Sequence, residues 1–144
     1  MLLQMIARRK TIVKKNSVVH FEIYAAEADK LGQFYKNLFD WNIEKMPGME
    51  YSWIKTVETD AKGTPTQPGG INGGILKRPN GYNGPAWVNY VNVESIEASV
   101  DRAKKLGGTL MKGKTPVPGM GWFAFLNDPQ GNTFALWQSD SNAK

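Results

Sequence analysis

The chain has 144 residues, of which 41% are hydrophobic and 22% charged, a composition that builds a globular core and argues against wholesale disorder. It contains no cysteine, which excludes disulfides, thiolate metal sites and a cysteine nucleophile. The net charge of +5 comes from residues 1–15, which have no acid and five basic residues, Arg8, Arg9, Lys10, Lys14 and Lys15. In the rest of the chain the basic and acidic residues balance at 13 each (18 − 5 = 13).

This charge distribution limits the partners we expect. Nucleic-acid-binding domains spread basic residues over a folded face, so we interpret residues 1–16 as a basic N-terminal arm and expect no nucleic-acid partner. No run approaches the ~18 apolar residues of a membrane span. Met1–Ile6 precedes the positive charges, the reverse of a secretory signal. We therefore expect a cytoplasmic protein without a membrane partner.

The first half of the folded region predicts a strand, a helix and three more strands. Val18–Tyr24 alternates and is rich in β-forming residues. Ala25–Phe39 follows as a helix with an apolar face. Further strands are predicted at Trp41–Met46, Tyr51–Val57 and Ile71–Leu76, the last two separated by a polar loop over Thr59–Gly70. By helical spacing, four side chains of the helix are assigned to the core: Phe34, Tyr35, Leu38 and Phe39.

After a linker at Arg78–Pro85, the same order of elements returns. Ala86–Val93 is predicted as a strand and Glu94–Leu106 as a helix, with Ser95 as its cap and Gly107-Gly108 at its end. Strands follow at Thr109–Lys112, Gly121–Leu126 and Thr133–Gln138. A shift of 68 residues sets Leu38 against Leu106, His20 against Val88 and Glu22 against Tyr90. The chain thus predicts two βαβββ modules, about 17–78 and 86–139, in one α+β domain over 17–139, with a tail over 140–144.

Five segments in this order resemble the glyoxalase, bleomycin-resistance and extradiol-dioxygenase proteins, the vicinal-oxygen-chelate superfamily. They are His20–Ile23 with Phe34–Trp41, the glycine-rich Gly70–Gly74, Val91–Val93 with Ala103–Gly108, Gly119–Ala124, and Asp128–Asn132. Asp40 stands where the superfamily often has glycine. The resemblance covers about residues 17–139. It implies two curved sheets enclosing a cavity, paired either within one chain or across a dimer, and a homodimer by analogy.

The resemblance also implies where a metal would bind. Glyoxalase I enzymes take ligands from the first, fourth, fifth and eighth strands, and extradiol dioxygenases use two His and one Glu in similar places. His20 fits the first position. The fifth-strand position falls on Val88 or its neighbours, the eighth on Ala135, and the fourth strand has no acid. One ligand does not hold a catalytic metal against water, so we expect no metal and no other cofactor.

His20 and Glu22 remain candidate catalytic residues, because residues two apart on a strand face the same side. A neutral imidazole near a carboxylate is suited to acid/base work, or to an atypical divalent metal site that includes His20. The alternative is a structural pair, with His20 satisfied inside the fold and Glu22 hydrogen-bonded to the backbone.

A set of residues on the inward faces of the strands is predicted to line the cavity and bind a ligand. It combines aromatic walls with a few polar groups, as small-molecule sites do. The alternative is that these aromatic residues fill the core. Trp122, near the implied cavity mouth, is predicted to stack on a planar ligand. The set is Tyr24, Val88, Tyr90, Asn92, Trp122, Ala135 and Trp137.

Two functions follow from these expectations. The first is a protein that binds a small planar or aromatic molecule without metal, as the bleomycin-resistance members sequester a drug. The second is a lyase, isomerase or dioxygenase-like enzyme that uses His20 and Glu22. Lactoylglutathione lyase activity is not expected, because most of the metal ligands are missing.

Overall fold

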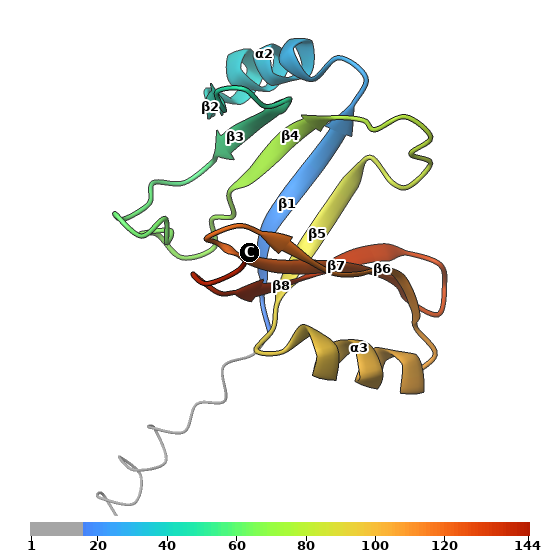
Figure 1. Ribbon diagram of the computed structural model, residues 1–144. Helices are drawn as coiled ribbons and strands as arrows, with labels where there is room; N and C mark the ends of the chain where they lie inside the picture. Colours follow the sequence, from blue (N-terminus) through green and yellow to red (C-terminus); the bar gives the residue numbers. More distant parts are fainter. Residues whose placement is uncertain (1–15) are drawn as a thin grey trace, which may run out of the picture.

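The computed structural model describes residues 16–144, so the basic residues of the predicted arm lie outside the described part. Within it, eight strands form one curved, open sheet in the order β2-β3-β4-β1-β5-β8-β7-β6, with two helices (Figure 1). The elements are β1 (Val18–Ala25), α2 (Ala28–Phe39), β2 (Asn42–Lys45), β3 (Tyr51–Lys55), β4 (Gly73–Lys77), β5 (Trp87–Asn92), α3 (Ile96–Lys105), β6 (Thr109–Val117), β7 (Gly121–Asn127) and β8 (Thr133–Ser139).

The two βαβββ modules pair within one chain, through β1 and β5. These strands run antiparallel, with His20 opposite Tyr90 and Glu22 opposite Val88. In each module the first strand also pairs in parallel with the last, β1 with β4 and β5 with β8. The sequence left open whether the modules pair within the chain or across a dimer, and the structure decides for pairing within the chain.

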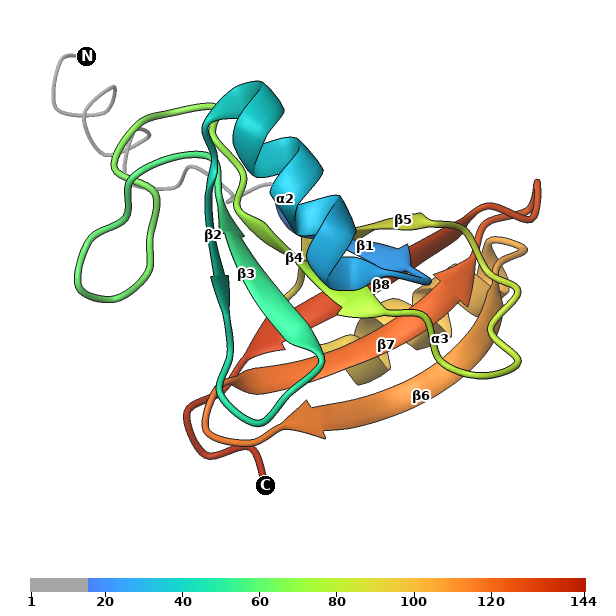
Figure 2. The same ribbon diagram turned by 90° about the horizontal axis from the view of Figure 1, so that it is seen from above.

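Helix α2 covers the outer face of the first module (Figure 2). Ile23, Ile54 and Ile75 are almost fully buried beneath it, and its own Leu31 and Tyr35 pack onto them. The helix ends at Asp40, which adopts the left-handed conformation with φ 57°. Aspartate tolerates this region better than most residues, which explains how it replaces the glycine common in the superfamily.

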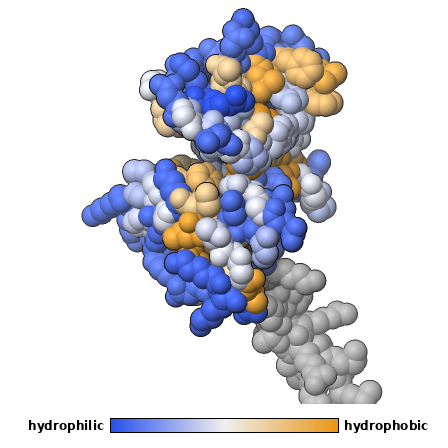
Figure 3. Space-filling view, turned by 90° about the vertical axis from the view of Figure 1, so that its right-hand side faces the viewer, coloured by the Kyte–Doolittle hydropathy of each residue, from blue (hydrophilic) through white to orange (hydrophobic). Residues whose placement is uncertain are grey.

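Three of the four side chains of α2 assigned to the core are in fact exposed. Phe34, Leu38 and Phe39 are 56%, 57% and 52% exposed, and only Tyr35 packs against the buried cluster. Figure 3, which views one side of the molecule, shows hydrophobic surface at the end that carries α2. The apolar arc of the helix is wider than the strip that contacts the sheet, so helical spacing alone overestimated the core.

Helix α3 covers the outer face of the second module, at the opposite end of the molecule in Figure 1. Ile96 and Val100 pack against Ala124 and Leu126 of β7 and Leu136 of β8. The predicted cap is present, since the Ser95 hydroxyl oxygen accepts a hydrogen bond from the Ala98 backbone N–H at 3.2 Å. Gly107 takes φ 95°, so glycine ends the helix as expected.

A third buried cluster lies on the sheet face turned away from both helices, here called the inner face. Tyr24, Val88, Tyr90 and Ala135 form its buried centre. Leu76, Tyr82, Phe123, Phe125 and Trp137 pack around them and are partly buried. The centre of the predicted cavity is therefore filled by side chains, and a ligand on this face would rest on the outer layer.

Three strands differ from the sequence prediction by two residues or more. β6 runs from Thr109 to Val117, five residues beyond the predicted end, because an edge strand tolerates Pro116. β3 ends at Lys55 rather than Val57, and β4 begins at Gly73 rather than Ile71. In the described residues, no helix has the length and apolarity needed to cross a membrane.

Candidate functional site

His20 and Glu22 meet on the inner face, as the alternation of β1 predicts. The His20 Nε2 atom lies 3.3 Å from Glu22 Oε1. Their side chains are 23% and 15% exposed, so both are screened from bulk water and still reachable from it.

Two tyrosine hydroxyls complete the hydrogen bonding of Glu22. Tyr51, from β3, donates to Glu22 Oε1 at 3.3 Å, and Tyr90, from β5, donates to Glu22 Oε2 at 2.9 Å. The Tyr51 hydroxyl also lies 3.3 Å from His20 Nε2. The structural alternative placed the partners of Glu22 on the backbone, whereas the structure supplies them from side chains.

The pKa values of these tyrosines are raised, so their hydroxyls stay protonated at neutral pH. Burial is the main cause of the raised pKa of Tyr51 and Tyr90, and the negative charge of Glu22 is the second. The same two causes raise the pKa of Tyr24. Because phenols in this state donate, Glu22 serves as the acceptor at the centre of the site.

Aromatic rings surround the polar centre. The Trp53 and Tyr90 rings meet the His20 ring edge to face, with centroids 6.1 and 5.2 Å away. Phe123 and Phe125 extend the wall on β7, with centroids 5.4 Å apart. The sequence prediction missed Tyr51, Trp53 and these two phenylalanines. Strand alternation shows that 51 and 53, like 123 and 125, share a face, but not that this face is the inner one.

Six of the seven residues predicted to bind a ligand belong to the inner face, at different depths. Tyr24, Val88, Tyr90 and Ala135 are at most 6% exposed and form its floor. Trp137 is partly buried in the surrounding layer. Asn92 shares its face by alternation and pairs with Trp137 in the sheet. Their role in binding stays a prediction.

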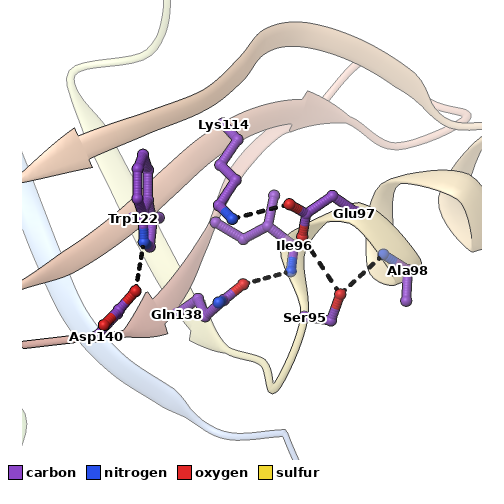
Figure 4. A network of polar contacts seen from close by, with 8 residues as sticks. All are labelled: Ser95, Ile96, Glu97, Ala98, Lys114, Trp122, Gln138 and Asp140. Carbon is purple, nitrogen blue, oxygen red and sulfur yellow. Dashed lines mark hydrogen bonds and ion pairs between the residues drawn. The ribbon is translucent and has the colours of Figure 1, made fainter. Parts of the chain in front are cut away.

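Trp122 lies on the other face of the sheet, which corrects its predicted place near the cavity mouth. Its ring packs against the cluster beneath α3. Its indole N–H donates to Asp140 Oδ2 at 3.0 Å, and Lys114 Nζ lies 4.5 Å from the ring centroid (Figure 4). Trp122 and Phe123 alternate along β7, and it is Phe123 that faces inward.

The positions that correspond to metal ligands do not fit a metal. Gly74 pairs with Glu22 in the first module, and Ala135 pairs with Tyr90 in the second, so Gly74 is the counterpart of the eighth-strand position. Gly74, Val88 and Ala135 all lack a ligating side-chain atom. Across residues 16–144, no three His, Cys, Asp or Glu side chains converge into a possible metal site.

The side-chain amide of Asn72, two residues before Gly74, is already hydrogen-bonded to the backbone. Its Oδ1 accepts from the backbone N–H groups of Thr56 and Val57 at 2.7 and 3.0 Å, and its Nδ2 donates to the Val57 carbonyl at 3.1 Å. These bonds close the long loop between β3 and β4. The side-chain oxygen of Asn72, just before β4, is therefore used to hold this loop rather than to face the site.

The curved sheet, the β1–β5 junction and the paired modules define the vicinal-oxygen-chelate fold. A family model described as "Glyoxalase-like domain" matches residues 18–137. The chain therefore belongs to the glyoxalase-like domain family, and the match spans both modules.

Curated relatives agree with this assignment. The chain is 30% identical over 114 residues to "Putative glyoxylase CFP32" of Mycobacterium tuberculosis, a match that covers 75% of this chain and 40% of that protein. It is 23% identical over 128 residues to a "Glyoxylase-like domain-containing protein" of Didymella fabae, covering 87% and 95%. The chain thus spans about 40% of the length of the mycobacterial relative.

Solved structures confirm the fold. A variant of methylmalonyl-CoA epimerase from Streptomyces coelicolor is similar with a TM-score of 0.61 and 15% identity, covering 91% of this chain and 99% of that chain. A hypothetical protein from Bacillus halodurans has a TM-score of 0.59 and 16% identity, with the same coverage. A glyoxalase/bleomycin resistance protein/dioxygenase superfamily member from Vibrio splendidus has a TM-score of 0.58 and 14% identity, covering 87% of this chain and 100% of that chain.

Proposed function

We propose that this chain binds a small planar or aromatic molecule on its inner face without the divalent metal used by many proteins of this fold. The observation that carries the proposal is the polar centre of His20 and Glu22 within aromatic walls, beside three ligand positions occupied by Gly74, Val88 and Ala135. Small-molecule sites combine apolar walls with a few placed polar groups.

The partly buried residues around the centre of the inner face are the ones a ligand would contact. Trp53, Phe123 and Trp137 are partly exposed and present ring faces or edges to a flat ligand. The partly exposed His20 imidazole, beside the Tyr51 hydroxyl, offers a hydrogen bond at one end of it. Flat ligands with one polar edge therefore suit the site better than flexible, highly charged ones.

The first experiment is elemental analysis of freshly purified protein, with His20→Ala as the control. We expect no stoichiometric Zn, Ni, Fe or Mn. Near-stoichiometric metal that is lost in His20→Ala would contradict metal-free binding and favour an enzyme with an atypical site.

The second experiment is a thermal-shift screen of planar aromatic compounds and antibiotics. A ligand present at about 100 times its Kd should raise the Tm by about 5 to 10 °C. Trp53→Ala should abolish the rise, whereas Trp122→Ala, a tryptophan of the opposite face, should keep it. A hit that loses its effect in Trp122→Ala but not in Trp53→Ala would place binding elsewhere.

A second candidate function is a lyase, isomerase or dioxygenase-like enzyme, favoured by the 3.3 Å contact between His20 and Glu22. In it, the His20 imidazole accepts a proton from the bound molecule and the Glu22 carboxylate stabilises the imidazolium that forms. Methylglyoxal–glutathione hemithioacetal, offered to the metal-loaded protein, should not be isomerised. Turnover that disappears in His20→Ala would establish the enzyme instead.

A further inference from the structure

Tyr51 reaches Glu22 across an intervening strand. Tyr51 stands on β3 and Glu22 on β1, and β4 lies between them. Gly74 of β4 pairs with Glu22 on one side and with Trp53 on the other, directly beneath the path of the Tyr51 side chain. A Cβ atom built on Gly74 would overlap the hydroxyl oxygen and Cζ of Tyr51. The Tyr51 ring therefore crosses β4 only because residue 74 has no side chain.

The far end of Tyr51 sits at the centre of the polar cluster. Its hydroxyl oxygen lies 3.3 Å from His20 Nε2 and 3.3 Å from Glu22 Oε1, and those two atoms are also 3.3 Å apart. The hydroxyl proton goes to the carboxylate, and the oxygen lone pairs can accept from the imidazole. One neutral phenol thus links the only histidine of the chain to its carboxylate partner.

The geometry points to a replacement: the Tyr51 hydroxyl, admitted by Gly74, takes the place at this centre that metal-using proteins of the fold give to a fourth-strand ligand and its metal. A side chain at position 74 would displace the Tyr51 ring from its present position, so a fourth-strand ligand and the hydroxyl exclude each other at this place. Gly74 is then a positioning residue that acts through Tyr51. The inference rests on the proposed metal-free function and names the groups that replace the metal.

The experiment compares Gly74→Ala in two backgrounds, the natural chain and Tyr51→Val. Valine keeps the strand propensity of β3 and ends before β4. We expect Gly74→Ala to lower the Tm of the natural chain by about 4 to 10 °C, as overpacking does. In the Tyr51→Val background it should change the Tm by less than about 2 °C. Gly113→Ala, which has open space around it and no positive φ, is the matched control.

Equal losses in both backgrounds would overturn the inference, because Gly74 would then be needed for a reason other than Tyr51. If Gly74→Ala alone does not fold, folding of the double variant supports the inference. Failure of the double variant as well, with Tyr51→Val folded, contradicts it.

The NMR signals of the single histidine give a second measurement, which does not depend on the stability of the fold. Its ring signals in a proton–carbon NMR spectrum belong to His20 without assignment. We expect these signals to move in folded Gly74→Ala and in Tyr51→Phe, to stay in place in Gly113→Ala, and to ignore equimolar ZnCl₂. Unchanged signals in Gly74→Ala, or a shift with equimolar Zn²⁺ in the natural chain, would refute the replacement. Failure of every planar compound to bind, with the coupling intact, would refute only the proposed function.

Discussion

At the scale of single residues, Glu22 organises the inner face because both of its carboxylate oxygens accept hydrogen bonds. Tyr51 and His20 lie at one oxygen, and Tyr90 donates to the other. A partly buried carboxylate that lost one of these partners would remain desolvated without compensation. The tyrosines therefore support the site as well as shape it.

Tyr90→Phe tests this support directly. The variant keeps the ring but leaves Glu22 Oε2 without its 2.9 Å donor, so the free energy of unfolding should fall by about 1–3 kcal/mol in urea denaturation. Tyr82→Phe is the control, because its hydroxyl donates to the Pro85 carbonyl on an exposed loop and its loss should cost less. Equal costs in the two variants would contradict the central role of Glu22.

The sequence predicted part of this site. It placed His20 and Glu22 together because alternation on one strand is a local rule that neighbouring elements do not change. It missed Tyr51, because 31 positions separate Tyr51 from His20 and only the order β3-β4-β1 brings them into contact. It misplaced Trp122, since the glycines before it gave no indication of which side of β7 would face inward.

At the scale of elements, α2 separates what a pattern predicts from what packing selects. The helix was predicted over the right region, but its apolar face was taken to be buried throughout. Leu31 and Tyr35 pack against the sheet, whereas Leu38 is 57% exposed. A single helix contacts a sheet along a narrow line, and the residues beside that line stay at the surface.

Leu38→Lys should therefore change the free energy of unfolding by no more than about 0.5 kcal/mol, as exposed substitutions do. Ile54→Ala is the contrast, because Ile54 is fully buried under the same helix and its truncation should cost about 2–5 kcal/mol. Urea denaturation of both variants measures the difference. A loss of several kcal/mol in Leu38→Lys would return Leu38 to the core.

At the scale of the whole molecule, Tyr24, Tyr51 and Tyr90 make the stability of the fold depend on pH in the alkaline range. Their pKa values in the folded protein are raised above 10, first by burial and then by the charge of Glu22, whereas in the unfolded chain they ionise near pH 10. Above that pH the unfolded state loses protons first. The contribution of these tyrosines to the free energy of unfolding should therefore be fully present below about pH 10 and be lost as the pH rises further.

Urea midpoints between pH 7 and pH 11.5 measure this dependence. Tyr90→Phe removes one of the three groups, so its stability should fall less steeply above pH 10 than that of the natural chain. Parallel curves would mean that Tyr90 does not contribute to the alkaline loss.

By itself, the sequence determined the order of elements, the two-module repeat, the C-terminal ends of both helices and the shared face of His20 and Glu22. These depend on local rules of periodicity, capping and strand alternation. The tertiary structure alone decided that the modules join within one chain, that Tyr51 crosses Gly74 to reach Glu22, and that Trp122 faces outward. Such contacts depend on strand order and register, which no local pattern specifies.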